Sequence, residues 1–141
     1  MNKIQKYSIG AALAIFYYLA YSGNLSHIIA SHEQHHLFLF TEAYFEQQMQ
    51  SEGFFSYLTG FIIQFFYYPA LGSALLALLL ASVYLMTRNI IHWVFGKEDL
   101  LHLSILPSLA LFYHTMEASH TLVPVTTTVS ALAIVNLIVW I

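Results

Sequence analysis

The sequence predicts an all-α, polytopic integral membrane protein with about four membrane-spanning helices. Three observations lead to this fold class. The 141 residues are 59% hydrophobic and only 8% charged, whereas a soluble domain carries about 25% charged residues. Several apolar runs approach the ~20 residues that cross a bilayer. The charged residues between these runs are also separated by sign, because the basic residues fall on one predicted side of the membrane and most acidic residues on the other.

The first apolar run covers about residues 9–20 and follows Lys3 and Lys6. Tyrosines flank this run, and such aromatic side chains concentrate at membrane interfaces. A cleavable signal peptide is the alternative, because a basic start, a short apolar core and small residues before Gly23 also fit that pattern. Tyr21 suits a cleavage site poorly, so we favour an uncleaved anchor. Both interpretations put the following loop outside.

Residues 23–68 form the predicted outer loop, with helices that lie along or re-enter the membrane interface. Thr41 is placed to cap a short amphipathic helix that starts with Glu42. Gly53 suits the position just after the end of that helix. An aromatic helix follows until Pro69, which divides the apolar sequence into an interfacial segment and a second span.

The second span is predicted over about residues 70–87, and a short polar connection over 88–99 follows it. The third span, about 100–116, is interrupted by Pro107, and the last span covers 122–141. With the N-terminus in the cytoplasm, every lysine and arginine falls inside, which satisfies the positive-inside rule. Five of the seven acidic residues then fall outside, namely Glu33, Glu42, Glu46, Glu52 and Glu117.

A histidine-rich stretch of the outer loop has the spacing of a zinc-protease signature. His32, Glu33 and His36 read as H-E-x-x-H, in which two histidines one helical turn apart bind zinc and the glutamate activates water. A third ligand could come from the other outer loop. The residues considered as ligands of a divalent metal are His32, His35, His36, His114, Glu117 and His120. Solvated loop histidines are the alternative interpretation.

Other classes of site are excluded by composition. The chain has no cysteine, so disulfides, thiolate zinc ligands and a cysteine nucleophile are absent. Its four basic residues do not cluster, so nucleic-acid binding is not predicted. Residues 1–141 are expected to form a single membrane domain, and the apolar end suggests the N-terminal part of a longer protein. The oligomeric state cannot be predicted from the sequence.

The middle of the chain resembles a known family. Residues 32–88, "HEQHHLFLFTEAYFEQQMQSEGFFSYLTGFIIQFFYYPALGSALLALLLASVYLMTR", resemble the start of a bacterial family of large polytopic inner-membrane proteins, known only as a domain of unknown function. The matching features are the acidic LFLF segment, the Tyr44–Phe45 pair, Gly53, the aromatic run before Pro69 and the small-residue span after it. Ser51 and Glu52 stand where the family has Pro-Gly. The resemblance implies a location in the bacterial cytoplasmic membrane.

The layout is also similar to that of membrane glycosyltransferases of the C-type fold. Those enzymes begin with one span, continue with a long acidic outer loop that carries interface-parallel helices, and end in a helical bundle. This fold-level analogy implies an enzyme that acts on a lipid-linked glycan within membrane lipids, with Glu33 as catalytic base or as ligand of a divalent cation. An H-E-x-x-H metalloprotease and a non-enzymatic transporter or scaffold are the alternatives.

Overall fold

The predicted all-α fold is confirmed. The computed structural model describes residues 3–25, 38–96, 102–117 and 121–140, and every regular element among them is helical. The elements are α1 (Lys3–Ala20), η1 (Tyr21–Leu25), α3 (Glu42–Ser51), α4 (Phe54–Ile63), η2 (Gln64–Tyr67), α5 (Pro69–Phe95), α6 (Ile105–Met116) and α7 (Val123–Trp140).

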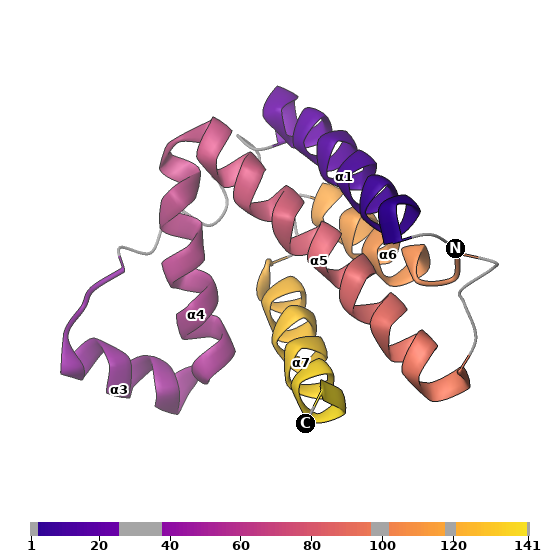
Figure 1. Cartoon of the computed structure of the whole chain (residues 1–141). Coiled ribbons are helices and arrows are strands. Elements are labelled where there is room, and N and C mark those ends of the chain that lie inside the picture. The colour runs from indigo at the N-terminus through magenta and orange to yellow at the C-terminus, as the bar shows by residue number, and fades with distance from the viewer. Residues whose placement is uncertain (1–2, 26–37, 97–101, 118–120, 141) are drawn as a thin grey trace.

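The long helix α5 is the centre of the molecule, and α1, α6 and α7 pack against it (Figure 1). Pro69 is the first residue of α5, where its missing N–H and fixed φ suit a helix start. The predicted division of the apolar sequence at Pro69 is thus confirmed. At the other end, Gly96 adopts φ +60° and its N–H donates to the His92 carbonyl at 3.0 Å, which closes the helix.

The predicted polar connection over residues 88–99 is wrong in its first part, because α5 continues to Phe95. Arg88 does not end the helix. Its side chain is only 7% exposed and donates from Nη1 to the Tyr84 hydroxyl at 2.9 Å. Interacting side chains four residues apart on one face stabilise a helix. The contact between Tyr84 and Arg88 therefore keeps Arg88 within α5.

The predicted third span is also shorter than expected. Helix α6 has 12 residues and begins at Ile105, so Pro107 lies in its first turn, where proline is tolerated, and does not interrupt it. Within the described ranges, two helices are long and apolar enough to cross a membrane, and these are α5 and α7.

Buried hydroxyl groups join α1 to α6 and α5. Tyr17 Oη lies 2.7 Å from Ser108 Oγ, and Ser108 donates to the Leu80 carbonyl at 2.7 Å. One turn further along the chain, at the start of η1, the Tyr21 hydroxyl bonds to Thr115. From the first hydrogen-bonded pair to the second, the residue numbers rise in both segments. The helices α1 and α6 therefore run parallel to each other. Intramolecular hydrogen bonds of this kind contribute about 0.5–1.5 kcal/mol each.

A small residue lets the connection before α5 pack closely on that helix. Phe66 in η2 is buried against Gly72, and a Cβ added at Gly72 would lie 2.8 Å from the Phe66 Cα and 2.7 Å from its ring. Phe66 also belongs to the core cluster that includes Tyr17, Tyr21 and Phe112. Gly72 therefore fixes how η2 enters the bundle.

We expect Gly72→Ala to destabilise the protein by about 1–3 kcal/mol, the usual cost of overpacking, because the clash involves backbone atoms. The matched control is Gly60→Ala in α4, where the added Cβ would meet the Phe38 ring at an ordinary 3.5 Å. Thermal unfolding in detergent, followed by tryptophan fluorescence, measures both variants. Equal midpoints for the two variants would contradict the close contact.

Candidate functional site

The predicted outer loop contains a helical hairpin, which we call the outer lobe (residues 38–68). The prediction for its first helix is confirmed: Thr41 caps α3, and its hydroxyl accepts from the Tyr44 N–H at 3.3 Å. Gly53 follows the end of α3 with φ +85°, a conformation that favours glycine. Its N–H donates to the Gln48 carbonyl at 2.9 Å. This corner turns the chain from α3 into α4 (Figure 1).

Aromatic rings hold the outer lobe together. The Phe38 ring is 8% exposed and contacts four other rings with centroid distances of 4.9–5.7 Å. These rings are Phe40, Tyr44, Tyr57 and Phe61. Edge-to-face pairs of this kind stabilise by about 0.5–1.5 kcal/mol beyond the burial of area. The lobe is thus held by apolar packing, and its polar groups lie around that cluster.

One hydrogen bond joins the outer lobe to the last helix. Thr59 Oγ1 lies 2.7 Å from Thr126 Oγ1, and both side chains are 3% exposed. Thr59 is one of the polar residues on the otherwise apolar helix α4. Ser56, one turn earlier, instead bonds to the Glu52 carboxylate of the corner. The hydroxyl of Thr59 therefore serves helix packing.

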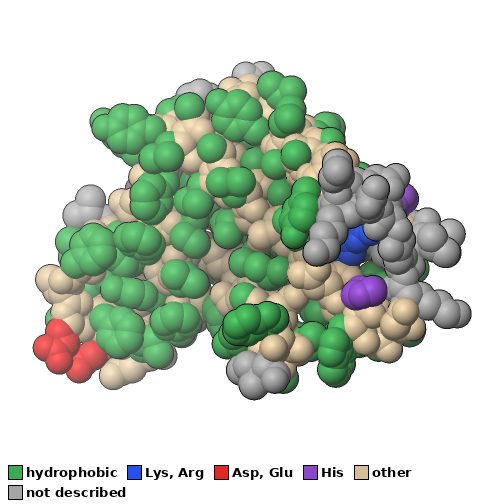
Figure 2. All heavy atoms as spheres, in the orientation of Figure 1, with side chains coloured by type: hydrophobic (Ala, Val, Ile, Leu, Met, Phe, Trp, Pro, Cys, Tyr) green, Lys and Arg blue, Asp and Glu red, His purple; other side chains and the backbone are tan. Residues whose placement is uncertain are grey.

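Charged side chains of opposite sign lie apart on one face of the molecule. Figure 2 shows acidic side chains on the α3 side and a basic side chain on the opposite side. Glu42 and Glu46 are exposed on α3. Burial, with a smaller contribution from the Glu52 carboxylate, raises the pKa of Tyr44. The lobe therefore presents carboxylates without a neighbouring cation among the described residues.

Most of the predicted site residues lie outside the described residues. These are Glu33, His32, His35, His36 and His120. Glu117 is described: it follows α6, and its N–H donates to the His114 carbonyl at 3.4 Å. Within the described ranges, no group of three or more histidine or acidic residues could hold a metal ion. The metal site stays a prediction.

Sequence reasoning placed Arg88 in a connection and so missed that it is buried. Tyr84 precedes Arg88 by one helical turn, but this spacing alone does not distinguish a buried arginine from one that ends a helix. A buried arginine is costly in an apolar environment and needs hydrogen-bonding partners, and the Tyr84 hydroxyl is one of these.

The sequence of the chain matches the family of unknown function DUF6057 over residues 2–141. The chain belongs to DUF6057. The resemblance to a family of unknown function is thereby confirmed, and the DUF6057 match extends beyond residues 32–88 on both sides. Neither the curated proteins nor the solved structures give a match to this chain, so the likeness to C-type glycosyltransferases stays a prediction.

If the H-E-x-x-H spacing of this DUF6057 chain marks a metal site, we expect one zinc ion per purified chain and its loss in His36→Ala. Replacing one of two ligand histidines removes most of the affinity of such a site. The control is His92→Ala, a histidine near the end of α5, which should keep the metal. Elemental analysis of the purified variants is the measurement, and a metal-free wild type would end the hypothesis.

Proposed function

We propose that this DUF6057 chain is a multi-pass protein of the bacterial cytoplasmic membrane, with its N-terminus inside and its outer lobe at the outer interface. The observation that carries this proposal is the apolar exposure of α7. This helix spans 18 residues, about 27 Å at 1.5 Å per residue, and only 11% of it is buried. Such a helix is stable in lipid, whereas in water it would be an aggregation hazard.

Exposed apolar side chains on the other helices support the same placement. Figure 2 shows one face of the molecule covered largely by hydrophobic side chains. Ile15 and Leu19 on α1 are 60% and 64% exposed, and Leu78 on α5 is 63% exposed. These positions would contact lipid tails. The short α6 would be accommodated within the bundle, where Ser108, Phe112 and Thr115 are buried.

The direction of the helices supports the proposed topology. Helix α1 runs opposite to α5, so the start of α1 and the end of α5 lie at one end of the bundle (Figure 1). Lys3, Lys6 and Arg88 belong to these segments. The acidic α3 lies to the side of the bundle, beyond α4 and away from these basic segments (Figures 1 and 2). The positive-inside rule then assigns the first end to the cytoplasm.

We expect a single cysteine at Gln47 on α3 to react with a membrane-impermeant thiol reagent on intact spheroplasts. A single cysteine at Trp93, near the end of α5, should react only after the cells are broken. Both positions are exposed, and the natural chain has no cysteine that could interfere. The reverse pattern, or equal labelling of both variants, would overturn the topology.

For the molecular activity, we propose a role on lipid-linked glycans at the outer face. The support is the order of elements: one helix, then an acidic segment with the outer lobe, then a bundle, as in C-type membrane glycosyltransferases. The aromatic side chains at the rim of the lobe suit a position at the headgroup level. Phe40, Tyr67 and Tyr68 are 79%, 72% and 65% exposed. Such a lobe lies where a lipid-linked substrate presents its sugar.

On this proposal, Glu33→Gln in the intact protein abolishes transfer of the glycan while the amount of protein in the membrane is unchanged. The substitution removes a general base or metal-ligating charge without changing size. Glu46→Gln, on the exposed side of α3, is the matched control and should keep full activity. Product analysis of lipid-linked glycans in the host is the measurement. Normal transfer by Glu33→Gln would leave the scaffold role as the better account.

A further inference from the structure

Helix α3 is polar, yet its place beside the bundle puts it level with the middle of α7. Thr59 in α4 pairs with Thr126 in the first turn of α7, and these two helices run in opposite directions (Figure 1). Phe54, where α4 meets the corner with α3, lies about 7.5 Å before Thr59 along the helix axis. The corner is therefore about 12 Å beyond the start of α7, near the middle of that helix.

A bilayer does not accept α3 at that depth. No residue of α3 is buried, and its exposed side chains include Glu42, Glu46 and Gln47. In the proposed placement α7 crosses the membrane, so its middle lies among the lipid tails. A carboxylate at that depth costs more free energy than one hydrogen bond contributes. The docked position of α3 and a membrane-spanning α7 therefore exclude each other in a chain that only lipid surrounds.

The hydrogen bond that docks α4 on α7 can be released without leaving a polar group unpaired. Thr59 Oγ1 also lies 2.7 Å from the Phe55 carbonyl of its own helix. Thr126 Oγ1 likewise lies 2.9 Å from the Val123 carbonyl. Each hydroxyl has one proton, so two protons can fill only two of the three contacts that these oxygens make. After separation both hydroxyls donate within their own helices, and the number of hydrogen bonds is unchanged.

The joint between α1 and α6 differs in this respect. The Tyr17 hydroxyl has Ser108 as its partner, and Ser108 uses its own proton on the Leu80 carbonyl. Two protons there fill two contacts, so separation of the helices would leave the Tyr17 hydroxyl unpaired. A buried donor that loses its partner bears the full cost of desolvation. These three helices, α1, α5 and α6, are therefore held together more firmly than α4 is held on α7.

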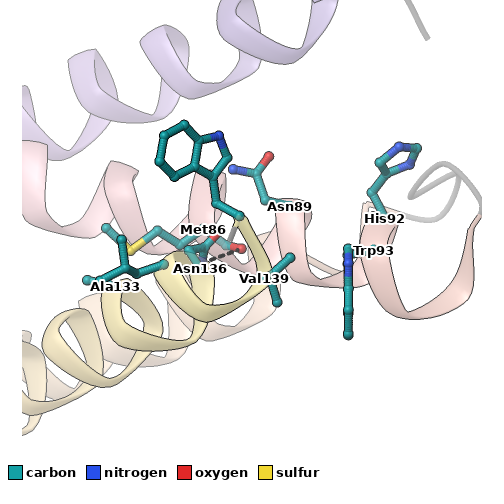
Figure 3. Close-up of a pocket in the computed structure, with 9 residues that line it drawn as sticks. Met86, Asn89, His92, Trp93, Ala133, Asn136 and Val139 are labelled. Carbon is teal, nitrogen blue, oxygen red and sulfur yellow. Dashed lines mark hydrogen bonds between the residues drawn. The ribbon is translucent and has the colours of Figure 1, made fainter.

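Helix α7 is also held on α5 by a bond that does not exchange partners. Asn136 Nδ2 donates to the Met86 carbonyl of α5 at 3.3 Å and to the Leu132 carbonyl of its own helix at 2.8 Å (Figure 3). An amide nitrogen has two protons, so both bonds form at the same time. Loss of α5 would leave one proton unpaired, which retains α7 on the bundle when α4 leaves it.

The connection at η2 provides a pivot for α4. Phe66 in η2 is buried against Gly72 of α5 and belongs, together with Ile63, to the core cluster. These contacts fix the junction of α4 and η2 on the bundle. A 3₁₀ stretch between helices often marks a hinge. Thr59 and all of α3 precede this junction, so a bend there moves them while the bundle keeps its packing.

We propose that α4 swings away from α7 about η2 when the chain lies in a bilayer, which brings α3 from the depth of the lipid tails to the outer headgroups. The swing rests on the membrane placement proposed above and is independent of any activity on glycans. In the swung position α4 lies along the interface, where its aromatic side chains are favoured. Thr59 and Thr126 exchange hydrogen-bond partners between the two positions without losing a bond.

Distances between paired nitroxide labels measure the swing in the purified full chain in lipid nanodiscs. Cysteines at Gln47 on α3 and Leu137 on α7 carry the labels, since both positions are exposed and the natural chain has no cysteine. The comparison is the same labelled chain with three apolar substitutions on α3, namely Glu42→Leu, Glu46→Leu and Gln50→Leu, which remove the reason to leave the lipid.

We expect the label distance in the wild-type background to exceed that in the triple variant by about 10–15 Å, because the ten residues of α4 form an arm about 15 Å long. Labels at Ile15 on α1 and Tyr113 on α6, both exposed, are the control pair. Their distance should be the same in both backgrounds. Equal distances between α3 and α7 in the two backgrounds would overturn the swing.

Thr59→Val tests the exchange of partners. This nearly isosteric change removes one hydroxyl while Thr126 still donates to the Val123 carbonyl, so the thermal midpoint in detergent should stay within about 1 °C of the wild type. Ser108→Ala leaves the Tyr17 hydroxyl unpaired and should lower the midpoint by about 4–8 °C. Equal losses in the two variants would contradict a bond that is released at no cost.

Alkaline extraction separates failure of the swing from failure of the membrane placement. Protein that is released from membranes refutes the placement. Protein that stays in the membrane, but gives the same distance between α3 and α7 in both backgrounds, refutes the swing alone. The second outcome would favour a further protein that covers the docked α3.

Discussion

Hydrogen bonds between buried polar side chains of different helices are the interaction on which the arrangement of this bundle depends. A buried hydroxyl or amide without a partner costs about 2–7 kcal/mol on transfer scales. The chain reduces this cost by pairing several polar side chains across helices, while Ser73 Oγ and Thr87 Oγ1 are buried without a partner in the described part of the chain. Tyr17 and Ser108 join α1 to α6, Thr59 and Thr126 join α4 to α7, and Asn136 reaches α5. Each of these pairs also sets how two helices are aligned.

The helical class and the local signals could be predicted from the sequence because they depend on short-range chemistry. Thr41 caps α3 through a side-chain bond within four residues, and Pro69 begins α5 because of its fixed φ. The last apolar run predicted the limits of α7 to within two residues. These features need no knowledge of distant contacts.

The end of α5 and the length of α6 could not be predicted, since they depend on neighbours that are remote in sequence. Arg88 was interpreted as the start of a connection because a charge ordinarily leaves an apolar helix. Its burial depends on what packs around the end of α5. For the site, Glu33 and its histidines lie outside the described residues, so their roles rest on spacing alone. The pairing of Thr59 with Thr126 across 67 positions had no signal in a single sequence.

At the corner between α3 and α4 the chain changes direction with an unusual backbone conformation at one residue. Positive φ is confined to Gly53, while Glu52 has an ordinary negative φ of −128°. One glycine is thus sufficient for this corner. Position 52 is free to carry a side chain, and its carboxylate bonds to Ser56 at the start of α4. A bend of this design requires glycine at one position, so the two positions before it can carry polar side chains while the path of the backbone stays the same.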